Sequence, residues 1–262
     1  MRTQPFTAVT DAPVILDAHE RVWRLTLNRP QQGNACSAEL VSALERILGR
    51  AESEQAQALV LQGNGRHFCT GFDLSRLEHE TDDTLLSRFV RIELMLQRMR
   101  RAPFLTIAIA HGRTVGAGAD LLAACDVRLA LPGTTFAFPG ARGFGLVLGT
   151  RRLAERVGPE TALEWIESGR SIAAEEACAR GLITAIAAVP ADADGILAAR
   201  ALLDRSLSRA LHQAPAPARV AEDAADLQQL VHSAACPGLR ERIAVYAART
   251  AARAGSSPPS SQ

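Results

Sequence analysis

Ala108-Ile-Ala-His-Gly-Arg-Thr-Val-Gly-Ala-Gly-Ala-Asp-Leu-Leu-Ala-Ala-Cys-Asp126 is the stretch around which the chain is organised. The apolar run Leu105–Ile109, which leads into it, predicts a buried strand, and Leu121–Cys125 predicts a helix packed into a core. A strand that passes through a glycine-rich turn into a helix leaves backbone N–H groups near Ala117 without helical partners. Asp120 follows one helical turn later, so its carboxylate is expected to project toward the same point. The stretch therefore predicts an active site of backbone amides and a single carboxylate.

The composition narrows the class of protein. All 29 basic residues are arginine, so a Schiff-base lysine, a pyridoxal-phosphate anchor and a Walker-A lysine are excluded. The five cysteines form no C-x-x-C pair and the six histidines show no ligand spacing, which predicts reduced thiols, no metal site and a cytoplasmic location. A net charge of +1 gives no reason to expect a nucleic-acid partner. No apolar run reaches the roughly 18 residues of a membrane span, so we expect no membrane partner.

Strand and helix patterns alternate over residues 1–190. We expect strands at Val14–Leu16, Val22–Leu27, Ala58–Leu61, Leu105–Ile109, Val127–Ala130, Phe136–Phe138 and Leu182–Val189, and helices at Ser37–Arg50, Asp82–Arg101 and, in short pieces, between Arg151 and Arg180. This alternation predicts an α/β fold of βαβ units with right-handed crossovers. Residues 191–254 have a helical pattern, at Ile196–Leu211, Ala218–Ala234 and Leu239–Arg253, and residues 255–262 are expected to be a disordered tail.

Several charged residues are predicted to serve the surface rather than a site. Arg88, Arg91 and Arg98 lie opposite the apolar side of the helix expected at 82–101, which favours a solvated face. The acids Glu78, Glu80, Asp82 and Asp83 are expected to form a solvated loop or a helix cap.

Two glycine-punctuated turns, Gly63–Leu74 and Gly112–Asp120, follow two of the buried strands. Taken singly, each pattern is that of an ordinary tight turn. If the two strands are neighbours in one sheet, however, one N–H from each turn can converge on a single oxygen. Such a pair of donors stabilises a thioester enolate, and the loss of one donor typically costs about 10²–10³ in rate.

Two other kinds of site fit the residues less well. Gly116-Ala-Gly-Ala-Asp-Leu121 also follows a strand and opens a helix, but Leu121 stands at the third glycine of a dinucleotide-binding fingerprint. The next strand carries Arg128 and no ribose-binding acid. Nucleophilic hydrolysis is disfavoured because the chain has no G-x-S-x-G elbow.

Several motifs taken together resemble those of the crotonase superfamily, the enoyl-CoA hydratase/isomerase family. They are Asn28-Arg-Pro with Asn34-Ala35, Gly63-x-Gly-x-x-Phe-Cys-x-Gly-x-Asp-Leu74, Ala108–Asp126, Phe136-x-Phe-Pro139 and Gly169-Arg-x-Ile-x-Ala-Glu-Glu-Ala-x-x-x-Gly-Leu182. The likeness covers about residues 12–253, in order and nearly without gaps. It implies a spiral of ββα repeats over residues 1–190, with a C-terminal helical region over 191–254 used for trimerisation.

The resemblance also implies an acyl-CoA substrate, a homotrimer or a hexamer made as a dimer of trimers, and no tightly bound cofactor, with coenzyme A present as part of the substrate. The amides of Phe72 and Ala117 would form the oxyanion hole. The channel for CoA and substrate would be lined by Arg29, Ala35, Thr70, Asp73, Leu74, Gly116, Pro139 and Gly140. Asp73 is expected to brace the oxyanion turn, and Tyr246 and Arg249 match C-terminal positions that reach a neighbour's CoA.

The chain departs from the family at its two catalytic glutamates. The first falls on Asp120 and the second on Gly140, and no Asp or Glu occurs from Val127 through Ala154. Asp120 sits in the first turn of its helix, where the macrodipole favours a charged carboxylate, so we expect a base held ionised. With one short carboxylate, slow hydration at best is expected.

One-base reactions remain open: shifting a double bond, breaking a bond β to an enolate, or decarboxylation. An anion such as bicarbonate beside Gly140, near Arg142, is a further hypothesis. The alternative from another class is a family member that has lost catalysis and serves as a binding or assembly subunit, which Gly140 favours. RNA binding, known for a relative, has no support in the absence of lysine and of a basic tract with aromatics.

Overall fold

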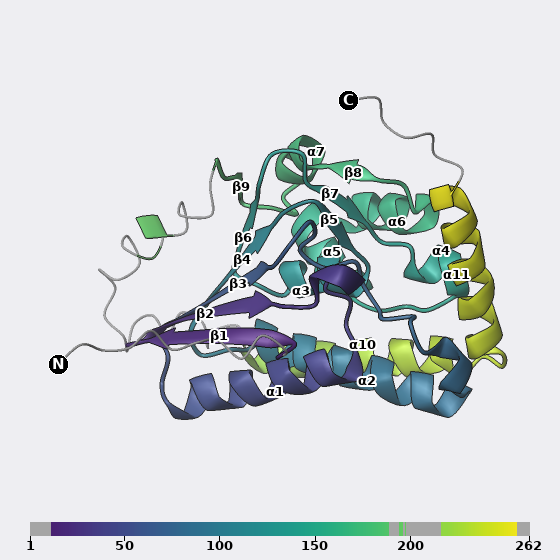
Figure 1. Ribbon diagram of the computed structural model, residues 1–262, viewed down its shortest axis with the longest axis horizontal. Coiled ribbons are helices and arrows are strands. Elements are labelled where there is room, and N and C mark those ends of the chain that lie inside the picture. The colour runs from purple at the N-terminus through teal and green to yellow at the C-terminus, as the bar shows by residue number, and fades with distance from the viewer. Residues whose placement is uncertain (1–11, 189–193, 196, 198–215, 256–262) are drawn as a thin grey trace.

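The computed structural model describes residues 12–188, 194–195, 197 and 216–255 (Figure 1). Two sheets lie within this part of the chain. The larger has the order β1-β2-β3-β4-β6-β9, formed by Val14–His19, Val22–Leu27, Ala58–Gly63, Leu105–Ala110, Val127–Ala130 and Ala185–Ile186. The smaller has the order β5-β7-β8, formed by Arg113–Val115, Thr135–Ala137 and Ile172–Ala173. β1 and β2 form the antiparallel hairpin expected from the sequence, and β2, β3, β4, β6 and β9 run parallel.

The chain winds repeatedly from the larger sheet to the smaller one and then into a helix. β4 leads to β5 and then to α3 (Ala117–Ala123), and β6 leads to β7 and then to α4 (Gly140–Phe144). Two earlier windings reach the smaller sheet only as single bridges, Cys36 with Phe72 and Cys69 with Thr114. The repeat of two strands and a helix that the resemblance implied is therefore present.

Two long helices lie side by side along one edge of the molecule in Figure 1. α1 (Ala38–Ser53) begins where Ser37 Oγ accepts a hydrogen bond from the Leu40 amide, which satisfies one of the free N–H groups of the first turn. α2 (Asp82–Arg100) begins with a reciprocal capping box between Thr81 and Thr84. The apolar faces of both helices join the main core, which also contains Leu59 and Leu61 of β3.

The arginines of α2 do not form the solvated face that we expected. Arg91 pairs with Glu45, and Arg98 donates to both carboxylate oxygens of Glu52 at 2.9 and 2.7 Å. Because Glu45 and Glu52 belong to α1, these ion pairs fasten the two helices to each other. The expectation was wrong because the partner acids lie about 46 positions earlier in the chain, beyond the reach of a helical pattern.

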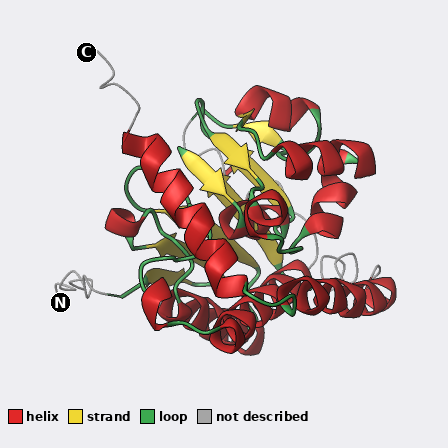
Figure 2. Cartoon of the chain, turned by 90° about the vertical axis from the view of Figure 1, so that its right-hand side faces the viewer, coloured by secondary structure: helices red, strands yellow, loops and turns green. Residues whose placement is uncertain are grey.

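The remaining helices enclose the smaller sheet and one end of the molecule. They are α5 (Thr150–Val157), α6 (Pro159–Ser168), α7 (Ala174–Ala179), α10 (Ala216–Ala234) and α11 (Leu239–Gly255), with 3₁₀ turns at Pro30–Gln32 and Leu77–His79. α11 crosses the front of the molecule in Figure 2 and contacts α4 and α2. The strand predicted at Leu182–Val189 is shorter than expected, and the helix predicted at Ile196–Leu211 lies outside the described residues apart from Leu197. In the described part of the chain no helix is both long and apolar enough to cross a bilayer.

Candidate active site

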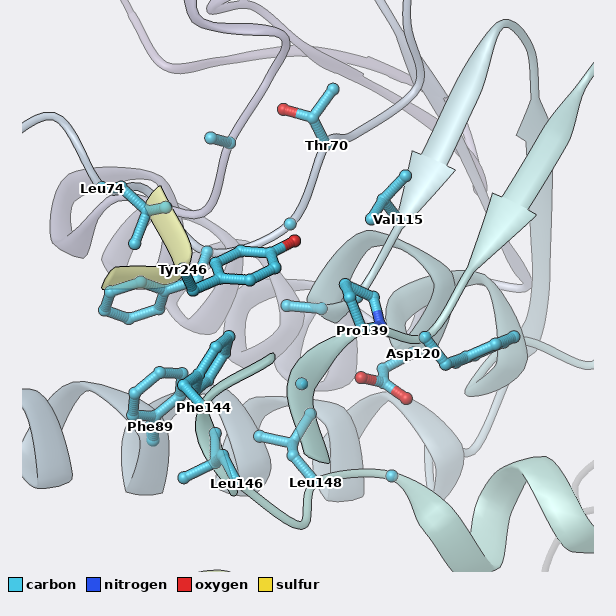
Figure 3. A pocket seen from close by; sticks show the side chains of 18 of the residues that line it. Thr70, Leu74, Phe89, Val115, Asp120, Pro139, Phe144, Leu146, Leu148 and Tyr246 are labelled. Carbon is cyan, nitrogen blue, oxygen red and sulfur yellow. The ribbon is translucent and has the colours of Figure 1, made fainter. Parts of the chain in front are cut away.

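A cavity of about 420 Å³ opens where α2, α3, α4 and α11 approach the ends of the strands (Figure 3). Ten of the eleven residues proposed for the site from the sequence line it: Ala35, Thr70, Phe72, Asp73, Leu74, Gly116, Ala117, Asp120, Pro139 and Gly140. The eleventh, Arg29, lines an adjoining polar pocket that shares Gln32, Asp73 and Ser75 with this cavity. The fold thus brings residues from four separate segments to one place.

The two glycine-rich turns lie side by side, as expected for turns that follow neighbouring strands. β3 and β4 are adjacent and parallel, and the Val115 amide donates to Cys69 O at 3.0 Å. The turns are so close that a Cβ built on Gly71 would lie 2.9 Å from Val115 O and 3.8 Å from the Ala117 nitrogen. In the described part of the chain, neither the Phe72 amide nor the Ala117 amide donates a hydrogen bond. The cavity wall therefore carries two unpaired N–H donors.

Charged side chains at the border between the cavity and the adjoining polar pocket hold the Phe72 turn. Arg29 Nη1 lies 2.7 Å from Asp73 Oδ2 and donates to Ala35 O at 2.7 Å, and Asp73 Oδ1 accepts from the Ser75 amide at 2.9 Å. Burial opposes ionisation of Asp73, but the hydrogen bonds from Ser75 and Arg29 lower the pKa of its carboxyl below the ordinary value. Asp73 therefore braces the turn as an ion-paired carboxylate.

Arg88 supports the same turn, although its pattern favoured a solvated position. Its Nη2 donates to Asp73 O at 3.2 Å, and its Cζ stands 4.1 Å from the centre of the Phe72 ring. Glu80 pairs with the same guanidinium. The arginine thus stacks on Phe72 through a cation–π contact and fixes the ring next to the amide that lines the cavity.

Asp120 reaches the cavity from the first turn of α3 and is nearly enclosed, with 3% of its surface exposed. Its Oδ1 has no hydrogen-bond partner in the described part of the chain. Gly149 packs so closely on it that a Cβ on this glycine, whose φ is +72°, would stand 1.9 Å from Oδ1. Any residue larger than glycine at position 149 would therefore displace the carboxyl group of Asp120.

Burial raises the pKa of Asp120 to about 8, with Arg152 opposing the rise and Glu93 adding to it. The carboxyl group is therefore mostly protonated at neutral pH. The expectation of an ionised base was wrong, because desolvation without a hydrogen-bond partner outweighs the dipole of a seven-residue helix.

A buried ion pair between α5 and α2 supplies the charges that act on the pKa of Asp120. Arg152 Nη1 and Nη2 donate to the two carboxylate oxygens of Glu93 at 2.7 and 2.6 Å, and both side chains are 1% exposed. Gln97 Nε2 adds a hydrogen bond to Glu93 at 2.8 Å. Because Glu93 compensates the charge of Arg152, that charge does not hold Asp120 in its ionised form.

At Gly140, where the resemblance placed a second catalytic carboxylate, the neighbouring groups are apolar or backbone. A Cβ on Gly140 would have Leu146 O at 3.4 Å and Phe144 Cζ at 3.9 Å. Arg142 donates to Glu167 O at 2.9 Å and does not line the cavity. Arg142 therefore gives no support to an anion beside Gly140, which stays a hypothesis.

Comparison with known proteins shows the family of this chain. The sequence profile of the enoyl-CoA hydratase/isomerase family matches residues 17–229. The chain belongs to this family. It is 42% identical to a Bordetella parapertussis protein assigned to the enoyl-CoA hydratases/isomerases, whose crystal structure superposes with a TM-score of 0.84 over 91% of this chain and 99% of that one.

Other relatives support the same family membership. EchA14 of Mycobacterium tuberculosis, assigned as an enoyl-CoA hydratase, is 34% identical over 71% of this chain and 74% of its own length. The crystal structure of an enoyl-CoA hydratase/isomerase from Xanthobacter autotrophicus, 26% identical, has a TM-score of 0.76 over 90% of this chain and 98% of that one. The two-sheet winding described above is the crotonase fold of this superfamily.

Within this family fold, α11 closes the cavity of its own chain. Tyr246 and Thr250 line the cavity, and the Tyr246 ring meets Phe144 edge-on with their centres 5.3 Å apart. Tyr246 thus lies at the cavity of its own chain, and the expectation that Tyr246 and Arg249 reach a neighbour's CoA stays a prediction. Phe89, Leu146 and Leu148 also line the cavity, but their sequence pattern is that of ordinary core residues and did not mark them as site residues.

In the described part of the chain, no three His, Cys, Asp or Glu side chains are grouped to hold a metal ion.

The protonation of Asp120 should appear in the stability of the protein. Its pKa is about 8 in the folded chain and close to the ordinary 3.8 in the unfolded chain, so between these values the folded state holds more protons. The free energy of unfolding should therefore fall as pH rises through this range, by the contribution of Asp120. Asp120→Asn removes this titration. Urea unfolding at several pH values should show a shallower fall for the variant, and equal slopes for the two proteins would contradict the assignment.

Proposed function

We propose that the protein is an acyl-CoA isomerase that moves a carbon–carbon double bond through a thioester enolate. The observation that carries this proposal is that Asp120 lines the cavity as a carboxyl group without a hydrogen-bond partner on Oδ1, while Gly140 leaves the second carboxylate position to Phe144 and Leu146. Asp73, the other acid of the lining, is occupied by Arg29 and Ser75. A single free acid–base group suits a reaction in which one group both removes and returns the proton.

The reaction balances with a single proton carrier. The Asp120 carboxylate takes a proton from C2 of a thioester with a double bond between C3 and C4, and the electron pair delocalises onto the thioester oxygen. The amides of Phe72 and Ala117 hold this oxygen as charge develops on it. The carboxylic acid then delivers the proton to C4, and the double bond rests between C2 and C3. A pKa of about 8 keeps both forms of Asp120 available near neutral pH.

Hydration and decarboxylation, two other reactions of the family, would each need a chemical group that the described cavity lining does not supply. Hydration needs a second group to orient and activate water, and the ring of Phe144 stands beside Gly140 instead. Decarboxylation needs a group that binds and orients the substrate carboxylate, and the single basic residue in the described lining is Arg113, which is exposed. The relatives are named as hydratases and isomerases, which supports acyl-CoA chemistry in general.

The expected homotrimer or hexamer is a separate proposal. Analytical ultracentrifugation of the protein would check it.

Proton exchange tests the enolate independently of the final product. A saturated acyl-CoA incubated with the protein in D₂O should exchange its C2 protons, as followed by NMR, and 3-hexenoyl-CoA should convert to the conjugated 2-enoyl thioester. Exchange should rise with pH through the pKa of Asp120, about 8, because the carboxylate is the base. Binding of CoA thioesters without exchange would instead support the non-catalytic subunit. Hydration of crotonyl-CoA as fast as isomerisation would also contradict the proposal.

A further inference from the structure

The cavity has a polar end and an apolar end. In Figure 3, Thr70 lies at one end, and Leu146 and Leu148 lie at the opposite end, with Asp120 to one side. Gln32 and Ser75 also line the cavity, and both belong to the adjoining polar pocket as well. The polar end therefore suits the CoA part of a thioester, and the apolar end is left for the acyl group.

Aromatic rings are concentrated at this cavity. The chain has 11 aromatic residues (8 Phe, 2 Trp and 1 Tyr), and five of them line the cavity: Phe72, Phe89, Phe138, Phe144 and Tyr246. Phe72 and Phe89 stack with centres 4.3 Å apart and an angle of 24° between their planes. Phe89 and Phe144 follow at 6.2 Å and 28°. The three rings form a nearly parallel series, which we call the ring wall.

The ring wall is held firmly but is not fully covered. Phe89 is buried in a cluster with Leu85, Leu146, Leu230 and Ile243, so its position is fixed by α2, α10 and α11. Phe72 and Phe144 keep part of their surface accessible, and both face the cavity. Accessible aromatic surface inside a cavity favours a ligand that removes it from water.

Among the described residues, the apolar end offers no cation as a partner to a second negative charge on the acyl group. Arg88 stacks on Phe72 and pairs with Glu80, and Arg152 is compensated by Glu93. Arg142 is directed to Glu167 O. A carboxylate placed among Phe144, Leu146 and Leu148 would lose its hydration without gaining an ion pair.

We infer that the apolar end of the cavity receives an uncharged, ring-bearing acyl group, an arylacyl chain of the phenylpropanoyl type carried on CoA. This inference rests on the proposed function, because it takes acyl-CoA as the ligand. A phenyl ring continues the parallel series of Phe89 and Phe144 by offset stacking, which a linear chain of equal bulk cannot do.

Calorimetric titration with four saturated thioesters tests this inference. Phenylpropanoyl-CoA should bind about threefold to tenfold more tightly than octanoyl-CoA, which is of similar bulk, because ring stacking adds to apolar burial. It should exceed acetyl-CoA by at least about tenfold, since acetyl-CoA leaves the ring wall in water. Glutaryl-CoA, which carries a distal carboxylate, should bind no more tightly than acetyl-CoA.

Phe144→Leu separates the ring from apolar bulk. This variant should lose the preference for phenylpropanoyl-CoA over octanoyl-CoA and keep its preference for octanoyl-CoA over acetyl-CoA, which also shows that the variant is folded. Equal affinity of the unmodified protein for the phenyl and octanoyl thioesters, or tightest binding of glutaryl-CoA, overturns the inference and leaves the isomerase proposal standing. Absence of binding by CoA and all four thioesters overturns both.

Discussion

Replacing Asp120 with asparagine is expected to lower kcat for double-bond isomerisation by about 10²–10⁴-fold. Asparagine occupies nearly the same volume, so the close contact with Gly149 is preserved. Its amide cannot take a proton from carbon or return one, and no other acid in the described lining is free to do so, because Asp73 is held by Arg29 and Ser75. Exchange of C2 protons in D₂O should fall by the same factor.

The matched control for this loss is Asp83→Asn. Asp83 is exposed at the start of α2 and lies outside the cavity lining, so the same chemical change there should leave kcat unchanged. The affinity of Asp120→Asn for a saturated acyl-CoA should stay within about threefold of that of the parent protein, since the amides and the channel are untouched. If the variant retains more than about a tenth of the parent activity, Asp120 is not the proton carrier.

Replacing Arg152 with methionine is expected to lower the free energy of unfolding by about 3–5 kcal/mol. Glu93 would then be a buried carboxylate without its two strongest donors, at 2.7 and 2.6 Å, and with Gln97 as the remaining hydrogen-bond donor. At present burial opposes the charge of Glu93, and the hydrogen bonds and charge of Arg152 lower the pKa of its carboxyl. Urea unfolding of the variant measures the loss.

Two further variants serve as controls for the stability loss expected of Arg152→Met. Arg170→Met breaks an exposed pair with Glu164 and Glu176, in which the arginine is 39% exposed, and should cost no more than about 1 kcal/mol. The double variant with Arg152→Met and Glu93→Met removes both buried charges and should recover most of the lost stability. A loss for Arg152→Met as small as that for Arg170→Met would show that the buried pair does not act as argued.

The turns of the site could be predicted from the sequence because their signals are local. Glycines after two apolar strands indicated two turns, and adjacency of β3 and β4 then placed Phe72 and Ala117 on one cavity. The helix starts at Ser37 and near Asp82 were readable for the same reason, since a cap depends on residues three or four apart.

The electrostatics could not be predicted in this way. The charge state of Asp120 depends on Gly149 covering it and on Glu93 compensating Arg152, two contacts between segments far apart in the chain. The helix dipole was visible in the sequence, but the burial that overrides it was not. The ring wall could not be predicted for a similar reason, because Phe89 repeats at the spacing of any core residue of α2 and its position at the cavity follows from how α4 and α11 pack.

The start of α11 is fastened to the start of α2 by one side chain. Asp82 accepts hydrogen bonds from the amides of Gly238, Leu239 and Arg240, at 3.0, 3.1 and 2.8 Å. α11 also carries Tyr246 and Thr250 to the cavity. Because three of its first amides are held by Asp82, α11 is anchored at its first turn, and we expect an opening of the cavity that moves this helix to displace Thr250 more than Leu239. Amide hydrogen exchange along α11 should therefore be slowest in its first turn and become faster toward Thr250.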